Sequence, residues 1–178
     1  NMIYLEKPLT EIFELKNIDG KDALSEISSN IYKLDNEIIK AWFFGMGNIY
    51  SFLKYKDYDL VIDRHFASNY FWNGTKRTDP IFKNMIELIG KPDITILLYA
   101  SVETRLKRLN KRNPNDTDLS DKEKHVLGYD KMISFLNDYE IPYIVVNTEE
   151  KTSEEVFNEV DEIIQNIKKE QYVKKLVK

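Results

Sequence analysis

The sequence predicts an α/β protein in which helices cover both faces of a parallel sheet. Short apolar runs, such as residues 60–62 and 94–99, are typical of strands that are buried on both faces. Longer segments with helical spacing or helix-capping residues separate these runs. Because parallel strands need a crossover between them, this alternation of strands and helices favours a parallel sheet.

Four apolar runs are the predicted strands, and helices are predicted around them. The strands cover residues 2–5, 60–62, 94–99 and 142–146, and the helices cover residues 23–29, 31–54, 79–88, 101–112, 120–137 and 152–167. Apolar side chains at steps of three and four make 31–54 a single helix. Ser101 is a candidate N-cap, and Thr152 begins a capping box with Glu155.

Composition indicates one globular domain with a sizeable core. The chain has 178 residues, of which 42% are hydrophobic and 31% are charged. A net charge of -4 argues against a partner that is a nucleic acid polymer, whereas a small phosphorylated ligand needs only a local basic pocket. There is no cysteine, no signal peptide and no apolar run near the roughly 20 residues that cross a membrane. We therefore expect a cytoplasmic protein without a membrane partner.

A charged pair stands at the end of a predicted strand, in the stretch DLVIDRHFASNYFWNG that begins at residue 59. Asp63 and Arg64 follow the apolar run directly. In open parallel sheets, ligands bind beyond the carboxyl ends of the strands, and the planar fork of donors on Arg64 suits a phosphate. The alternative is a structural ion pair at the strand end, and the residues alone leave both interpretations open.

Several segments, taken together, resemble the thymidylate kinase family. Asp-Arg-His at residues 63–65, followed by Ser68, Asn73 and Gly74, resembles its Asp-Arg-Tyr/His…Ser…Ala-Tyr-Gln-Gly signature. Other segments are similar to the strand, lid helix and flanking motifs of that family: KPDITILL at 91–98, the Glu-x-x-x-x-Arg-x-x-x-Arg helix at 102–112, Gly-Tyr at 128–129 and Glu-Lys-Pro at 6–8. The resemblance is good from about residue 58 to 165 and poor before it.

The resemblance implies a P-loop kinase fold, a three-layer sandwich in one domain over residues 1–178 with a lid at about 108–120. Such kinases use ATP and Mg²⁺ to phosphorylate a nucleoside monophosphate, here most of all dTMP, which becomes dTDP. The related deoxynucleoside kinases share much of the pattern, so phosphorylation of a 5′-hydroxyl is an alternative. Family members usually dimerise through helices, so the resemblance points to a homodimer.

Site roles follow from the same resemblance. Arg64 would hold the acceptor phosphate, and Asp63 would lie near the metal and the transferring group. Ser68, Trp72 and Asn73 would lie where the family contacts the acceptor base, with Trp72 in place of a Tyr and Asn73 in place of a Gln.

Two arginines in the predicted lid helix are candidates for catalysis and for binding ATP. Arg108 and Arg112 are four residues apart, so they share one face of a helix and would contact the donor and transferring phosphates. The alternative is a solvated basic face, since three further cations, Arg105, Lys107 and Lys111, lie nearby.

Aromatic side chains and histidines complete the candidates. Phe43 and Phe44 are candidates for stacking on a base, although aromatic residues at helical spacing also form cores. His65 and His125 are 60 residues apart without a ligand pattern, so no zinc site is expected.

The phosphate-binding loop of the family is not found in this sequence. None of the six glycines stands in the frame Gly-x-x-x-x-Gly-Lys-Ser/Thr. The resemblance starts at the second strand of the family, so we expect the first strand, the P-loop and the first helix, on the order of 25 to 30 residues, to be absent. Three explanations for this absence stay open, and Asn1 before Met2 favours the first two unless it is a tag residue. The upstream residues lie outside this sequence, they were cut away, or the chain is a degenerate relative that binds nucleotides without catalysis.

Overall fold

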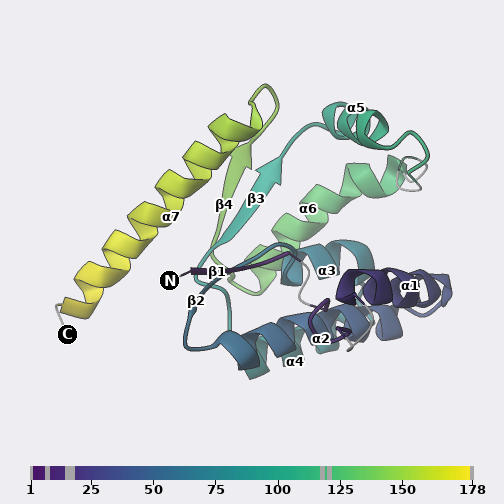
Figure 1. The fold of residues 1–178 in the computed structure, drawn as a ribbon, viewed down its shortest axis with the longest axis horizontal. Coiled ribbons are helices and arrows are strands. Elements are labelled where there is room, and N and C mark those ends of the chain that lie inside the picture. The colour runs from purple at the N-terminus through teal and green to yellow at the C-terminus, as the bar shows by residue number, and fades with distance from the viewer. Residues whose placement is uncertain (1, 7–8, 15–18, 117–118, 120–121, 177–178) are drawn as a thin grey trace. The chain divides into compact units, whose positions relative to one another are not determined.

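The computed structural model describes residues 2–6, 9–14, 19–116, 119 and 122–176, and it confirms the α/β class. Across these residues, four strands alternate with seven helices (Figure 1). The strands are β1 (Met2–Leu5), β2 (Asp59–Ile62), β3 (Thr95–Tyr99) and β4 (Tyr143–Asn147). The helices are α1 (Gly20–Lys33), α2 (Glu37–Tyr55), α3 (Phe66–Asn73), α4 (Asp79–Ile89), α5 (Val102–Arg112), α6 (Lys122–Asp138) and α7 (Ser153–Leu176).

The strands are parallel, as predicted, and they pair two by two among the described residues. β1 pairs with β2 from Met2 opposite Asp59 onward, and β3 pairs with β4 from Thr95 opposite Tyr143 onward. Helices α1 and α2 connect the first pair, while α5 and α6 connect the second. None of the helices in the described part of the chain is long and apolar enough to cross a bilayer.

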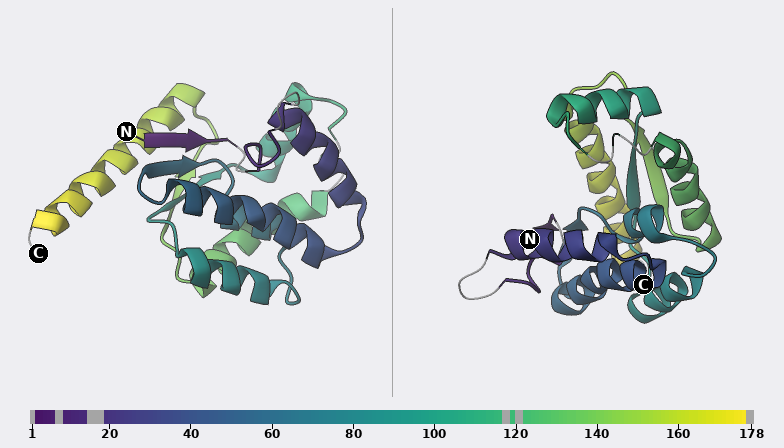
Figure 2. Two further views of the ribbon diagram at one scale, coloured as in Figure 1. Left: turned by 60° about the horizontal axis from the view of Figure 1, so that its bottom comes forward. Right: turned by 90° about the vertical axis from the view of Figure 1, so that its right-hand side faces the viewer.

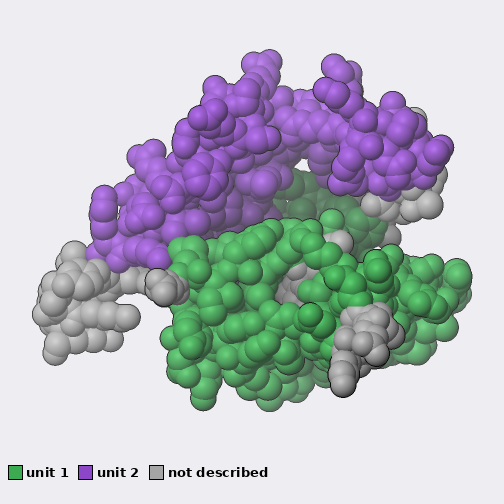
Figure 3. Space-filling view, viewed as in Figure 1, with its two compact units in different colours: residues 1–91, 127–140 green, residues 92–126, 141–178 purple. Residues whose placement is uncertain are grey.

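The chain forms two compact units, which Figure 3 colours separately. The first unit contains residues 1–91 and 127–140, and the second contains residues 92–126 and 141–178. Each strand pair belongs to one unit, and the chain passes between the units after residue 91, within helix α6 and after residue 140.

Aromatic packing fixes helix α3 in the first unit. Phe66, Phe82 and Phe135 are buried there, and the Tyr70 ring stacks on Phe135 with 4.4 Å between ring centroids. The Tyr70 hydroxyl donates a hydrogen bond of 2.8 Å to the carboxylate of Asp79 at the start of α4. Helix α2 packs against both α3 and α4 (Figure 2). As a result, α3 is held by three helices rather than by its own eight residues alone.

A half-buried carboxylate connects the segments that follow β3 and β4 in the second unit. Ser101 caps α5, as predicted, by accepting a hydrogen bond of 3.1 Å from the backbone nitrogen of Thr104. The Glu149 carboxylate, just past β4, accepts from the Ser101 backbone nitrogen at 2.6 Å, from the Ser101 hydroxyl at 2.7 Å and from the Thr104 hydroxyl. These hydrogen bonds, with that to Thr104 strongest, lower the pKa of Glu149 from 4.5 to about 2.

In the first unit, one expectation from the sequence was wrong and one helix was missed. Residues 31–54 do not form one helix, because α1 ends at Lys33 and α2 begins at Glu37. The Asn36 side chain between them caps α2 by accepting from the backbone nitrogens of Ile38 and Ile39, at 3.0 and 3.2 Å. Helix α3 was not predicted, because it is short and His65 at its N-cap position makes no side-chain cap. In the second unit, the predicted capping box of α7 is confirmed, since Thr152 and Glu155 exchange hydrogen bonds.

A prediction concerns Gly128 in helix α6. A β-carbon at this position would overlap the ring of Phe71 on α3. In an open helix, replacing Gly by Ala would stabilise by up to about 1 kcal/mol. Here we expect Gly128→Ala to lower the free energy of unfolding by about 1–3 kcal/mol, measured by urea denaturation, because the core is overpacked. Adding Phe71→Leu should restore part of this loss, and a stabilised single variant would contradict the packing described.

Candidate functional site

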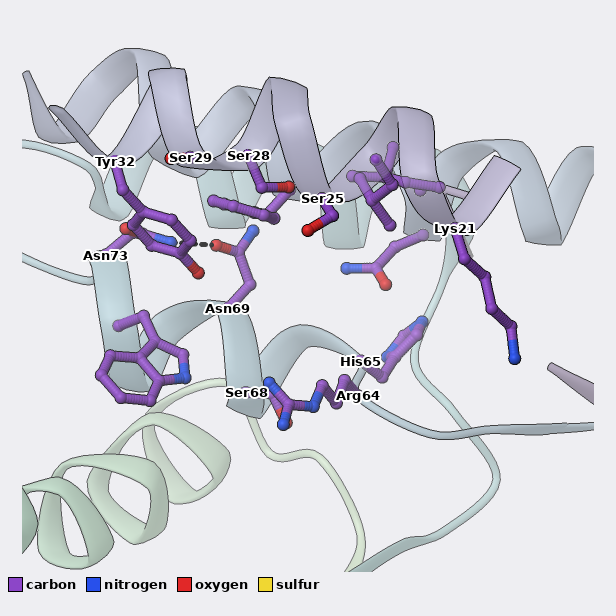
Figure 4. Close-up of a pocket in the computed structure, with 16 residues that line it drawn as sticks. Lys21, Ser25, Ser28, Ser29, Tyr32, Arg64, His65, Ser68, Asn69 and Asn73 are labelled. Atoms are coloured by element: carbon purple, nitrogen blue, oxygen red, sulfur yellow. Dashed lines mark hydrogen bonds between the residues drawn. The ribbon is translucent and has the colours of Figure 1, made fainter. Parts of the chain in front are cut away.

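A cavity of about 410 Å³ lies within the first unit, between α1, α2, α3 and the turn after β2 (Figure 4). Its walls are formed by Leu9, Lys21, Leu24, Ser25, Ser28, Ser29, Tyr32, Phe44, Gly47, Asn48, Arg64, His65, Ser68, Asn69, Trp72 and Asn73. We call this cavity the α1–α3 pocket.

Arg64 reaches the α1–α3 pocket from a strained turn at the carboxyl end of β2. The pairing with β1 ends at the preceding residue, where the Asp63 backbone nitrogen donates to the carbonyl of Leu5 at 2.9 Å. Arg64 then adopts φ of 71°, a left-handed conformation that costs a residue other than glycine about 1–3 kcal/mol. Figure 4 shows its side chain beside Ser68 at the pocket. Strain that persists beside a cavity is typical of functional sites.

Helix α3 contributes a polar wall that is bound to α2. Its lining residues, Ser68, Asn69, Trp72 and Asn73, share one face because they recur at helical spacing. The Asn73 side-chain nitrogen donates to the Asn69 side-chain oxygen at 2.9 Å, and the Asn69 nitrogen donates to the Ala41 carbonyl at 3.0 Å. Both asparagines are buried, so this chain of hydrogen bonds fixes their amide groups.

Helix α1 supplies a hydroxyl-bearing wall that the sequence analysis missed. Ser25, Ser28, Ser29 and Tyr32 follow Lys21 at steps that place all five on one helical face. In Figure 4, Ser25 and Tyr32 point from α1 toward the side of the pocket formed by Arg64 and α3. The signal available in the sequence was a run of hydroxyl side chains at helical spacing, where an apolar stripe would be expected on a core helix.

The charged groups of the pocket are cations. Lys21 and Arg64 line it, and its lining residues include no Asp or Glu. Burial lowers the pKa of His65 from 6.5 to about 4, so this imidazole is neutral at pH 7. The pocket therefore favours an anionic group near Arg64 and neutral polar groups elsewhere.

The pocket brings together five residues that were predicted from the sequence. They are Phe44, Arg64, Ser68, Trp72 and Asn73. Asp63 is exposed and is not among the lining residues, and Phe43 contacts the rings of Phe44 and Phe13 instead, at 5.0 and 5.9 Å between centroids. The roles assigned to all seven in binding or catalysis stay predictions.

Arg108 and Arg112 belong to the second unit and differ in their surroundings. The Arg108 guanidinium donates to the Thr148 hydroxyl at 2.9 Å, to the Thr148 carbonyl at 2.5 Å and to the Glu149 carbonyl at 3.2 Å. It thus fastens α5 to the segment after β4. The side chain of Arg112 is 71% exposed and forms an ion pair of 3.0 Å with Asp116. Contact of either arginine with ATP phosphates stays a prediction.

An arginine and a polar cavity at the carboxyl end of a parallel strand define an α/β protein suited to a phosphorylated ligand. The model of the thymidylate kinase family matches residues 33–160, which is more than half of the chain. The chain therefore belongs to the thymidylate kinase family, as the resemblance in its motifs implied.

A curated relative supports the assignment of the chain to this family. The "Probable thymidylate kinase" of Methanocaldococcus jannaschii is 32% identical over 114 residues, which are 63% of this chain and 57% of the relative. The chain thus matches little more than half of the length of that relative.

The two lid-helix arginines provide a matched pair for mutation. We expect Arg108→Ala to lower the free energy of unfolding by about 1–3 kcal/mol, because it leaves the Thr148 carbonyl without its guanidinium donor. Arg112→Ala should change it by less than about 0.5 kcal/mol, because an exposed ion pair contributes little. Chemical denaturation of both variants measures the difference, and equal effects would contradict the structural role of Arg108.

Proposed function

We propose that the protein phosphorylates a nucleoside monophosphate and that the α1–α3 pocket binds this acceptor, with dTMP as the preferred one. The observation that carries the proposal is the convergence of Arg64 with the aromatic and amide side chains of α2 and α3 in one cavity. Membership of the thymidylate kinase family supports a kinase role.

The pocket has the size and chemistry that a nucleoside monophosphate requires. Its volume of about 410 Å³ falls among the ligand sites of roughly 300–1,000 Å³ in proteins. Phe44 and Trp72 offer aromatic faces for a base, and Arg64 offers a charged fork for the phosphate. The neutral side chains between them suit a sugar and the edge of a base.

The phosphoryl donor is a separate matter. The family implies ATP and Mg²⁺, but the sequence holds no P-loop motif, and no group of three or more metal-binding side chains occurs among the described residues. In this proposal the α1–α3 pocket binds and orients the acceptor, and Arg108 and Arg112 stay the candidates for contact with the donor phosphates. Arg64 would neutralise the acceptor phosphate, which lowers its repulsion toward a second anion.

The alternatives make different demands on the pocket. A kinase that phosphorylates a 5′-hydroxyl would need a carboxylate base beside that hydroxyl, and none of the described residues that line the pocket is Asp or Glu. A nucleotide-binding protein without catalysis would have the same acceptor pocket but no turnover. Assays with ATP and either dTMP or thymidine, on the full-length gene product, separate these cases: formation of dTDP supports the proposal, formation of dTMP from thymidine supports the 5′-hydroxyl kinase, and no product supports binding without catalysis.

A substitution at Arg64 tests the proposed acceptor site. Arg64→Gly removes the guanidinium and also relieves the left-handed strain, so the melting temperature should not fall. The affinity for dTMP should fall roughly 10- to 100-fold, because a charge-assisted hydrogen bond to the phosphate is lost. Thermal denaturation of the full-length gene product measures the melting temperature, and isothermal titration measures the affinity.

Thymidine, which lacks the phosphate, is the control ligand. Its affinity should be the same for the wild type and for Arg64→Gly. An unchanged dTMP affinity in the variant would contradict the assignment of the phosphate to Arg64.

A further inference from the structure

We propose that Lys21 binds the terminal phosphate of a nucleoside diphosphate in the α1–α3 pocket, beyond the first phosphate at Arg64. A nucleoside diphosphate is the product of the proposed reaction, so this inference rests on the proposed function. It adds a phosphate-binding residue on α1 that was not among the candidates from the sequence.

The pocket presents its binding groups in a definite order along helix α1. Tyr32 marks one end, where its ring packs on Phe44 with 5.1 Å between the ring centroids. Lys21 marks the other end, because it precedes Tyr32 by about three helical turns, which is roughly 16 Å along the axis. In Figure 4, Arg64 lies between these two ends, across the pocket from α1.

A nucleotide carries its own groups in a matching order. With the base at the aromatic end and the first phosphate at Arg64, the ligand is directed toward Lys21. A second phosphate is joined to the first through a bridging oxygen, so it extends the ligand in this direction. The position of Lys21 therefore suits the second phosphate better than the base or the sugar.

The charges of the pocket agree with two anionic positions. Among the described residues that line it, Lys21 and Arg64 carry positive charges and none is Asp or Glu. His65 lies between these two cations in Figure 4, and its lowered pKa of about 4 leaves it neutral at pH 7. A diphosphate carries more negative charge than a monophosphate, and Lys21 is the cation that can balance the addition.

The ion pair of Lys21 with Glu6 is weak enough to be exchanged for a ligand. The ammonium nitrogen lies 3.1 Å from the Glu6 carboxylate, and the two side chains are 68% and 49% exposed. Ion pairs between exposed side chains contribute little to stability, because water and salt screen them. A phosphate carries more charge than a carboxylate and offers three acceptor oxygens, so it can replace Glu6 as the partner.

The backbone of Lys21 is fixed, while its side chain can pivot. Asp19 caps α1 by accepting a hydrogen bond of 2.7 Å from the Lys21 backbone nitrogen. A β-carbon on Gly20 would overlap the carbonyl oxygen of Thr10, so the start of α1 lies directly against the segment after β1. A lysine has a flexible stem and three donors. Lys21 can therefore turn from Glu6 to a phosphate without a shift of the helix.

Titration with dTMP and with dTDP, without ATP, tests this inference on the full-length gene product. Lys21→Met keeps a long apolar side chain and removes the charge. It should lower the affinity for dTDP roughly tenfold, because charge-assisted hydrogen bonds to the terminal phosphate are lost. The affinity for dTMP should change by less than about twofold, because its phosphate feels only a screened charge. Lys21→Arg should retain most of the dTDP affinity, because it keeps the charge.

Two further variants complete the test. Glu6→Gln should raise the affinity for dTDP roughly two- to fivefold, because Lys21 no longer has to leave an ion pair. Lys83→Met is the matched control, since Lys83 forms a similarly exposed ion pair with Glu87 on α4 and is not among the residues that line the pocket. Both affinities should be unchanged in this control.

The outcomes separate this inference from the proposed function. Equal losses of dTMP and dTDP affinity in Lys21→Met would assign Lys21 to the first phosphate, and no loss of either would leave it a partner of Glu6 alone. Each of these results overturns the inference, while the dependence of dTMP binding on Arg64 still supports the proposed function. A wild type that binds neither nucleotide contradicts the proposed function and the inference together.

Discussion

The turn from β2 to α3 is the constraint on which the candidate site depends. Parallel pairing with β1 holds the chain up to Asp63, and α3 begins at Phe66, so only Arg64 and His65 connect two fixed elements. Arg64 adopts a left-handed conformation to make this connection. The conformational cost is borne by Arg64, one of the two cations that line the pocket, and strain of this kind clusters at functional sites.

Packing around α3 keeps this turn in place. The stacked rings of Tyr70 and Phe135, and the hydrogen bond from Tyr70 to Asp79, hold the far side of the helix. The near side then presents its amides and Trp72 to the pocket. One helix thus serves both the core and the site, so core substitutions in the first unit should also affect ligand binding.

Local signals in the sequence predicted much of the fold and part of the site. The apolar runs gave the parallel strands, and the Ser101 and Thr152 caps marked helix starts, because these features depend on neighbouring residues. The break at Asn36 was missed because its cap interrupts an otherwise continuous apolar stripe. The place of Lys21 on the wall of the pocket could not be predicted, since it depends on how α1 packs in the first unit. The place of Arg64 at the pocket was predicted because it follows from the end of a strand.

A crystal structure of the full-length gene product with dTMP tests the central claim most directly. The account predicts the phosphate within hydrogen-bonding distance of the Arg64 guanidinium and the thymine ring between Phe44 and α3. A nucleotide bound outside the α1–α3 pocket, or one whose phosphate lies away from Arg64, would contradict it.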